Sequence, residues 1–424
     1  MSRVAEWESR LLEAADHSTD RLVTLLQELV QIPSVSGDEG PIAAAVATWA
    51  ASGGFDHRIV EPDGEQLSQH PAFTPPAAET FESRNDVIVH LRSGKPGRSI
   101  ALLAHTDVVP VDPNTTWSHD PWSGDLEDGK IYGRGSADCK GGAAVAMVAF
   151  EIFRDLGVPF NGDLQAQFVI EEEQGGNGTL AAILAGERAD AMIQLEPTST
   201  DYVLVSNRGA QFFQVEVPGV EGGVEYQHDL ASAIDNAFVI IEATKAYSLM
   251  REAQAKHDLY EGRYRTKVPL AICRIASGEW PSTVPGKAIL EGTIECLPGE
   301  DIEMVVDDFE AYLRRAAEQH HWLKDHPIAF KRFGLHFEAA ETAPDSPIVK
   351  TIMHASKSAL GRAPEVVGGG GSDLRLPVLY ADCPTVLYGP GGGMIHSVDE
   401  YVTVSELVDC LKVTLLVAYR WLIS

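Results

Sequence analysis

Long apolar runs, basic residues and paired cysteines are all scarce in this sequence of 424 residues. No stretch approaches the roughly 18 consecutive apolar residues that a membrane span needs, and residues 1–20 lack the hydrophobic region of a secretory signal. Lysine and arginine number 33 against 62 acidic residues, which gives a net charge of −29. A surface of this sign repels phosphate backbones and anionic lipids, so neither nucleic acid nor membrane is an expected partner.

The cysteines are few, odd in number and never spaced as C-x-x-C. A disulfide framework and a structural zinc site are therefore poor interpretations. The spacing favours buried free thiols in a reducing compartment, and the expected location is the cytoplasm. The five residues are Cys139, Cys273, Cys296, Cys383 and Cys410.

Short apolar runs alternate with helical patterns in the first half of the chain. Strands are expected at residues 87–91, 100–104, 165–170 and 191–195, and helices at 22–30, 41–51, 142–156 and 179–185. This alternation predicts an α/β fold with a mostly parallel sheet. Residues 61–84 are polar, rich in proline and without periodicity, and are interpreted as an excursion over the surface.

The pattern changes near residue 206. Between there and residue 336 the expected order is β-α-β-β-α-β, which is a compact split-βαβ unit. Strand, glycine-rich loop and helix patterns return afterwards. We therefore expect a catalytic domain in two parts, 1–205 and 337–424, interrupted by an inserted α+β domain at 206–336.

Imidazole and carboxylate side chains follow the predicted strands, where open α/β sheets place their sites. An H-x-D pair or an acidic triplet alone is ordinarily a solvated surface feature, but here several coincide at strand ends. Burying so many carboxylates without a cation would be prohibitively costly. Two histidines and three carboxylates suit two divalent ions about 3.5–4 Å apart that share a ligand. The five are His105, Asp138, Glu173, Glu196 and His396, and the other carboxylates of these clusters are Asp107, Glu171 and Glu172.

Beyond these general patterns, nearly the whole chain resembles a family of metallo-aminoacylases and carboxypeptidases. That family includes acetylornithine deacetylase, succinyl-diaminopimelate desuccinylase, aminoacylase and glutamate carboxypeptidase. The most specific segments are GKIYGRGSADCKGG at 129–142 and EEQGGNG at 172–178. The others are IPSVS at 32–36, HTD at 105–107, WSHDPW at 117–122, GSDLR at 371–375 and HSVDE at 396–400.

The resemblance implies a ligand for each metal position. Asp138 would bridge both ions, His105 and Glu196 would hold one, and Glu173 and His396 the other. The expected cofactor is one or two divalent ions per subunit, with zinc placed first and manganese or cobalt as alternatives.

The resemblance also implies roles around the metals. Asp107 would accept the second N–H of His105 and fix its tautomer, and Glu172 would be the general base. The inserted domain would be a lid and dimerisation domain, so a homodimer is expected. His228 is the candidate for a histidine that stabilises the oxyanion across the dimer, although its spacing to Asn236 departs from the family pattern.

Two positions that face the substrate in many family members differ in this chain. Ser282 stands where they have asparagine, and Glu295 stands where they have an arginine that grips the substrate carboxylate. A glutamate there removes a bidentate clamp and adds a repelling charge. Arg375 and Arg208 are alternative carboxylate anchors, and Arg375 is equally consistent with a structural ion pair to Asp373.

Three functions stay open from the sequence. The first is hydrolysis of an N-acyl amino acid or another small amide, with a small molecule as the partner. The second is an aminohydrolase that replaces the amine of an electron-poor aromatic amino acid such as 5-nitroanthranilate by hydroxyl, which the altered Ser282 and Glu295 positions make more credible. The third is a non-catalytic binding protein, which the complete set of ligands and Glu172 disfavours.

Overall fold

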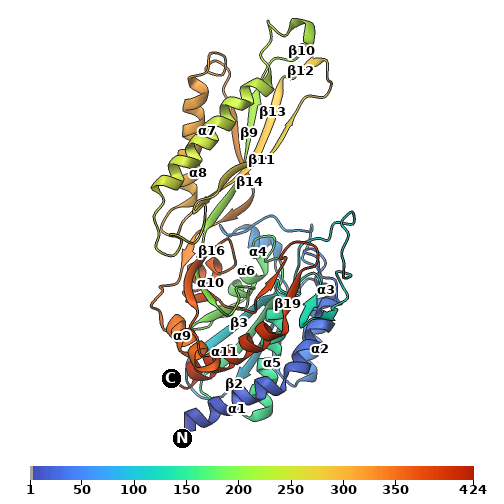
Figure 1. The fold of residues 1–424 in the computed structure, drawn as a ribbon, viewed down its shortest axis with the longest axis vertical. Helices are drawn as coiled ribbons and strands as arrows, with labels where there is room; N and C mark the ends of the chain where they lie inside the picture. The colour runs from blue at the N-terminus through green and yellow to red at the C-terminus, as the bar shows by residue number, and fades with distance from the viewer. Residues whose placement is uncertain (1–2) are drawn as a thin grey trace. The chain divides into compact units, whose positions relative to one another are not determined.

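The computed structural model describes residues 3–424, which divide into two compact units. The larger unit contains the residues up to Ser206 and those from Glu341 to Ser424, and the smaller unit is Asn207–Ala340. The smaller unit is one continuous segment of the chain, coloured from green to orange in Figure 1. It is therefore an insertion between two parts of the larger unit.

A mixed sheet lies at the centre of the larger unit. Over the described residues its order is β1-β2-β6-β3-β7-β17-β8-β15, with β16 beside β8. The central strands β6, β3, β7 and β17 are parallel, whereas β2 and β8 pair antiparallel with their neighbours. The expected α/β fold with a mostly parallel sheet is confirmed. The strands are β1 Asp56–Val60, β2 Asp86–Arg92, β3 Ser99–His105, β6 Asp163–Val169, β7 Met192–Gln194, β8 Tyr202–Asn207, β15 Ala340–Glu341, β16 Glu365–Gly369 and β17 Thr385–Leu387.

Helices cover the sheet of the larger unit. Helices α5 and α11 both contact β3 and each other, and α1 and α2 pack against that pair. A separate apolar cluster joins α4, α6 and α10 to β2 and the end of β6. The helices are α1 Arg3–His17, α2 Thr19–Val30, α3 Gly40–Ser52, α4 Gly64–Ser68, α5 Lys140–Leu156, α6 Asn177–Leu184, α9 Pro347–Leu360, α10 Arg375–Tyr380 and α11 Val404–Leu422.

Apolar runs explain the central elements. The run Ile100–Ala104 is buried along its whole length in β3, as expected for a strand covered on both faces. Helix α5 is buried on every side from Lys140 to Phe150, which is typical of a helix inside a core. Helix α1 and strand β1 were not predicted. Each buries few residues, Leu11 and Ala15 in α1 and Val60 in β1, so the apolar pattern is weak.

Most of residues 61–84 are exposed, as expected for an excursion over the surface, but the segment is not wholly irregular. The segment forms the short helix α4, whose first turn is capped by the Asp63 carboxylate. Leu67 and Phe81 pack in one apolar cluster with Ile170 and Leu180. Single side chains therefore anchor this surface segment to the core, although no periodicity in its sequence indicates this.

A second, smaller sheet supports the loops at one end of the larger unit. Its order is β18-β19-β5-β4, and its strands are β4 Leu126–Glu127, β5 Lys130–Tyr132, β18 Gly392–Gly393 and β19 Tyr401–Thr403. Strand β5 leads to the glycine-rich segment before α5, and β18 and β19 flank the loop that contains His396. The small sheet thus joins two segments that are more than 250 residues apart in the sequence.

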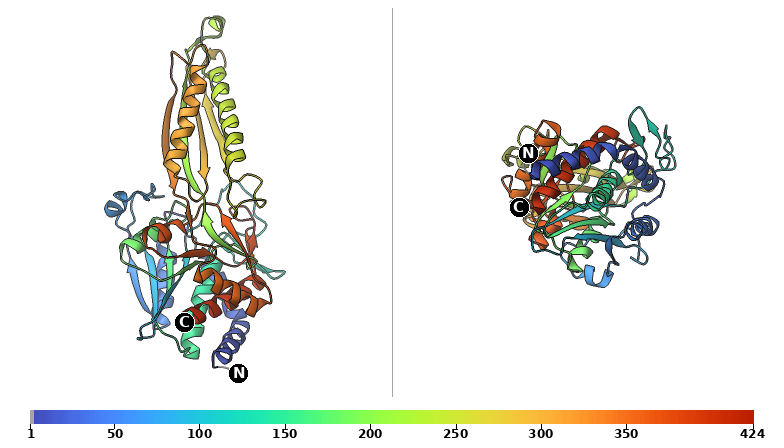
Figure 2. Two further views of the ribbon diagram at one scale, coloured as in Figure 1. Left: turned by 90° about the vertical axis from the view of Figure 1, so that its left-hand side faces the viewer. Right: turned by 90° about the horizontal axis from the view of Figure 1, so that it is seen from below.

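The smaller unit has the order β-α-β-β-α-β. Its sheet runs β11-β13-β9-β14, and α7 and α8 lie side by side along it (Figure 2, left). Phe213, Tyr247 and Phe309 form the centre of its core. The elements are β9 Gly209–Pro218, α7 Ala233–Gln254, β11 Leu270–Ser277, β13 Lys287–Cys296, α8 Ile302–Glu318 and β14 Ala329–Phe337, with a two-stranded antiparallel sheet of β10 Gly222–Gly223 and β12 Thr283–Val284 and a 3-10 turn Val224–Tyr226.

All five cysteines are free thiols. Four are buried, as predicted, but Cys273 is exposed on the edge strand β11, where the prediction of burial is wrong. In residues 3–424 we find no helix with the length and apolar character of a membrane span.

Candidate metal centre

The predicted ligands meet at one end of the large sheet. His105 is the last residue of β3, Glu173 follows β6, and Glu196 follows β7. These three strands are parallel neighbours, so their carboxyl ends lie at the same edge. Asp138 comes from the segment before α5 and His396 from the loop between β18 and β19. Five residues from five separate segments are thereby brought together.

The two oxygens of Asp138 point to different histidines. Oδ1 lies 2.8 Å from Nε2 of His105, and Oδ2 lies 3.3 Å from Nε2 of His396. Nε2 of His105 is also 3.7 Å from Oε2 of Glu196, and Nε2 of His396 is 3.1 Å from Oε1 of Glu173. Asp138 therefore stands between a His105–Glu196 pair and a His396–Glu173 pair.

These residues fit divalent ions by two observations. Ligands of a tetrahedral zinc lie about 2.0–2.2 Å from the ion, which separates them by about 3.3–3.6 Å, close to the distances between these donor atoms. In addition, Oε1 of Glu196 is buried with no hydrogen-bond partner among the described residues. A buried carboxylate oxygen without a partner is costly, and a cation would satisfy it.

Electrostatics also favour a cation. Hydrogen bonding to Asp138 and Glu173 raises the pKa of His396 to about 10. Burial raises the pKa of Glu196 above its ordinary value, although His105 opposes this effect. A raised histidine pKa beside several buried carboxylates indicates an excess of negative charge, which a cation would offset.

Glu172 adjoins this cluster. Burial and the negative charge of Glu196 raise the pKa of Glu172 well above its ordinary value. A carboxylate in this position can act as a proton acceptor and donor. The arrangement is therefore able to support acid–base chemistry beside a metal pair.

Asp107 lies where the sequence predicts it, but its contacts are different in detail. The nearer acceptor for Nδ1 of His105 is the main-chain oxygen of Asp107, at 2.9 Å, while the carboxylate is 3.5 Å away. The Asp107 carboxylate instead accepts the main-chain N–H groups of Glu172 and Glu173, at 3.1 and 3.3 Å, and the hydroxyl of Ser36. Asp107 thus holds the backbone of the two glutamates.

Glu400 is a site-building residue that sequence reasoning did not find. Its Oε1 accepts the main-chain N–H groups of Gly135, Ala137 and Asp138, and its Oε2 accepts a hydrogen bond from Arg134 at 2.6 Å. This contact joins positions 262–266 residues apart, so no local pattern could indicate it. Glu400 fixes the turn that presents Asp138.

Cys139 is a second residue near the metal ligands that was not predicted to be there. Its Sγ lies within 4.8 Å of donor atoms of His105 and Glu196, and it donates to the main-chain oxygen of Leu195 at 3.1 Å. Burial raises the pKa of this thiol well above its ordinary value. Cys139 therefore stays a protonated thiol, and we assign it a structural role beside the cluster and not a role as a ligand.

The residues predicted to contact the substrate are divided between the two units, unlike the predicted metal ligands. Arg375 is fully buried and donates to the main-chain oxygen of Gly175 at 2.9 Å. Arg208 pairs with Glu295 at 2.6 Å inside the smaller unit. His228 and Ser282 are exposed in turns of that unit. Arg375 belongs to the larger unit but is not in the donor groups around His105, and the other three residues belong to the smaller unit.

Comparisons with known proteins agree with this geometry. Residues 101–420 match the model of Peptidase family M20/M25/M40. A succinyl-diaminopimelate desuccinylase of Rhodospirillum centenum is 28% identical over 417 residues, which cover 94% of this chain and 97% of the relative.

Two solved structures share the fold. A tripeptidase of Staphylococcus aureus has a TM-score of 0.73 at 19% identity and covers 95% of this chain and 98% of its own. A dinuclear metal-binding peptidase of Bacillus subtilis has a TM-score of 0.65 at 16% identity, covering 96% and 99%. Together with the match over most of its length, these findings show that the chain belongs to Peptidase family M20/M25/M40 and is a metal-dependent hydrolase of carbon–nitrogen bonds.

Proposed function

We propose that this protein hydrolyses the amide bond of an N-acyl amino acid or a small peptide-like substrate. The observation that supports this most is Asp138, whose two oxygens face two separate histidine–carboxylate pairs. In this proposal Asp138 bridges two divalent ions. His105 and Glu196 complete one position, and Glu173 and His396 the other. Zinc is the first candidate for both, ahead of manganese and cobalt.

Bound metals would polarise the scissile carbonyl and lower the pKa of water at the site. Glu172 accepts a proton from the attacking water and donates it to the leaving nitrogen. Glu172 is buried beside Glu196 of the ligand cluster, which supports this role. Asp107 keeps Glu172 in place by accepting its main-chain N–H.

The substrate class is supported by the desuccinylase relative, whose name indicates an N-acyl amino acid. The carboxylate anchor is different in this chain. Arg208 is engaged by Glu295 at 2.6 Å, so it offers at most part of its guanidinium to a substrate. We infer a substrate in which a negatively charged α-carboxylate is gripped less tightly than a bidentate arginine would allow.

The smaller unit is proposed to mediate a homodimer. Helix α7 buries Ile240 and Tyr247 in the core but leaves Phe238 and Leu249 exposed, at 58% and 74%. Strand β11 is an edge of the sheet, and Ile275 on it is 55% exposed. Exposed apolar residues beside a free sheet edge are typical of an interface. The role of His228 across that interface stays a prediction. Four buried free thiols support a location in the cytoplasm.

A panel of substrates tests the reaction. The metal-loaded protein would be incubated with N-acyl amino acids, dipeptides and anthranilates, and the products identified by mass. Release of a free amine and a carboxylate is expected. Release of ammonia with hydroxyl on an aromatic ring would replace this proposal by the aminohydrolase, and absence of any turnover would favour a binding protein.

A further inference from the structure

Glu171 precedes the proposed base directly and has an unusual conformation. Its φ is +56°, a left-handed value that residues other than glycine adopt only when their surroundings hold them there. The turn places Glu172 and Glu173 after the end of β6. It is closed by hydrogen bonds from the N–H of Gly176 to the oxygen of Glu171, at 2.7 Å, and from Gly175 to Glu172, at 2.9 Å. Something must stabilise this conformation.

The Glu171 side chain supplies the first part of the explanation. It is fully buried, and its carboxylate accepts three hydrogen bonds. These come from Arg84 at 2.6 Å, the main-chain N–H of Ala77 at 2.9 Å and the amide of Asn177 at 2.7 Å. A buried carboxylate with three donors is held firmly, because each bond is charge-assisted. The backbone that it belongs to is held with it.

Two of those donors belong to residues 72–84, which we name the brace segment. Thr74 of this segment donates its hydroxyl to the oxygen of Gln174 at 2.8 Å, and Asn177 donates to the oxygen of Thr74 at 3.1 Å. A Cβ on Gly175 would lie 2.4 Å from the Thr74 hydroxyl, so the Thr74 side chain packs directly on the Gly175 backbone. The brace segment therefore contacts the turn of residues 171–177 along its length.

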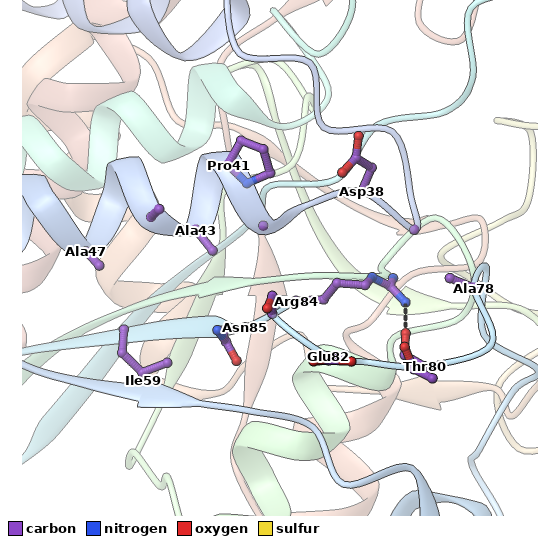
Figure 3. Close-up of a pocket in the computed structure, with 14 residues that line it drawn as sticks. Asp38, Pro41, Ala43, Ala47, Ile59, Ala78, Thr80, Glu82, Arg84 and Asn85 are labelled. Carbon is purple, nitrogen blue, oxygen red and sulfur yellow. Dashed lines mark hydrogen bonds between the residues drawn. The ribbon is translucent and has the colours of Figure 1, made fainter.

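Arg84 links the brace segment to a third element. It is buried, and it also binds Glu39, the residue before α3, through Nε at 2.5 Å and a second nitrogen at 2.8 Å. Its remaining nitrogen donates to the oxygen of Thr80 at 3.2 Å, a contact within the brace segment itself (Figure 3). Arg84 thus joins two buried carboxylates, of which only Glu171 belongs to the turn that presents Glu172.

We propose that Arg84 and Glu171 are positioning residues for the reaction. Through the left-handed turn at Glu171 they set where the Glu172 and Glu173 carboxylates lie relative to Asp138. This inference rests on the proposed function, which assigns Glu172 as the base and Glu173 as a ligand. The polar contacts of the brace segment are then part of the catalytic apparatus without touching substrate or metal.

Glu171→Gln and Glu39→Gln are a matched pair of variants. Each removes one of the two carboxylates that bind the same buried arginine, and each keeps the size of the side chain. Glu171→Gln is expected to lower kcat by about ten- to a hundredfold with KM changed less than about twofold, because misplacing a catalytic group by about 1 Å can cost about a hundredfold. Glu39→Gln is expected to lower the melting temperature about as much as Glu171→Gln does, but to leave kcat within about twofold of the parent value.

Titration with Co²⁺, followed by its visible absorption, supplies a readout besides activity. Glu171→Gln is expected to weaken one of the two Co²⁺ equivalents by about tenfold or more, since Glu173 moves with the turn, and Glu39→Gln to weaken neither. If no substrate of the panel is turned over by the parent protein, the proposed function fails, and the Co²⁺ titration still decides on the positioning.

Equal loss of kcat and of Co²⁺ affinity in both variants, in step with their melting temperatures, would overturn the inference. So would a folded Glu171→Gln protein with parental kcat and affinity. Should Glu171→Gln not fold, Thr74→Val decides, because it removes only the hydroxyl bond to Gln174. A loss of kcat of about threefold or more at parental KM supports the inference, and parental kcat contradicts it.

Discussion

The two units of this protein differ in what they bury. The larger unit buries charged residues with exposures near zero, including Glu171, Asp373, Arg375 and Glu400. In the smaller unit, over residues 207–340, the buried polar residues are Asn207, Gln211, Asn236 and Thr244, and none is charged. Burying a charge costs free energy unless it is paired or bound to a metal. The comparison indicates that the larger unit buries charged groups, at a cost in stability, because its site requires them. The smaller unit is stabilised by apolar packing.

Of the changes considered, metal removal should produce the largest difference between the two units. Dialysis against a chelator is expected to lower turnover more than about 10⁴-fold, because the metals supply the electrophile and the activated water. It should also lower the melting temperature of the larger unit, whose clustered carboxylates then repel one another, and leave that of the smaller unit unchanged. Calorimetry with and without chelator measures both transitions. An equal shift of both would show that the metals stabilise more than the larger unit.

Glu172→Gln should have the next largest effect on activity. It keeps the shape of the side chain but cannot accept a proton, so kcat is expected to fall by about 10²- to 10⁴-fold. The residue is not among the proposed ligands, and Co²⁺ should still bind with two equivalents. Turnover that is unchanged by this substitution would exclude Glu172 as the base.

Phe309→Ala tests the apolar side of the comparison. Phe309 is fully buried and packs edge-on against Phe213, with ring centroids 5.0 Å apart, and against Tyr247 at 5.2 Å. Truncation is expected to cost about 3–5 kcal/mol in the free energy of unfolding of the smaller unit. Metal affinity should stay unchanged.

Met304→Ala is the control on the same helix. Met304 is 65% exposed, so truncating it should change the free energy of unfolding of the smaller unit by less than about 0.5 kcal/mol. Weaker Co²⁺ binding in Phe309→Ala would contradict the separation of the two units, since no metal ligand lies in residues 207–340.

Local patterns in the sequence predict the framework of the larger unit. The apolar run Ile100–Ala104 predicts β3, and His105 at its end predicts a ligand, because the carboxyl ends of parallel strands share an edge. The sequence patterns also group Asp138 and His396 with it, but the metal position that each would hold depended on the family resemblance. Their contact joins segments far apart in the chain, and no spacing rule connects them.

Contacts made by single polar side chains could not be predicted. Arg84 and Glu171 are 87 residues apart, and the segment that contains Arg84 has no periodicity. That segment is anchored to the core by Phe81 and Leu67, two apolar residues too widely separated to indicate a helix or strand. The same holds for Glu400, whose role follows from three main-chain donors in another segment.

Arg251→Met is expected to have the smallest effect. Arg251 on α7 binds Glu300 through two nitrogens, at 2.6 and 3.0 Å. Burial raises the pKa of Glu300, but the hydrogen bonds from Arg251 and from the N–H of Leu297 outweigh it, so that the pKa lies below its ordinary value. The pair is partly exposed, and its loss should cost about 1 kcal/mol or less at pH 7.

The pH dependence of this loss distinguishes the ion pair from packing. Because the folded-state pKa of Glu300 is lowered, the stabilisation is fully present above the unfolded-state pKa of about 4.3 and disappears as the pH falls through the folded-state value. Urea unfolding of the smaller unit, parent against Arg251→Met, should therefore differ at pH 7 and converge below about pH 4. Lys245→Met, which removes an exposed pair with Glu242 on the same helix, is the control and should match the parent at both pH values. A difference that persists in acid would mean that Arg251 stabilises the unit through its packing and not through its charge.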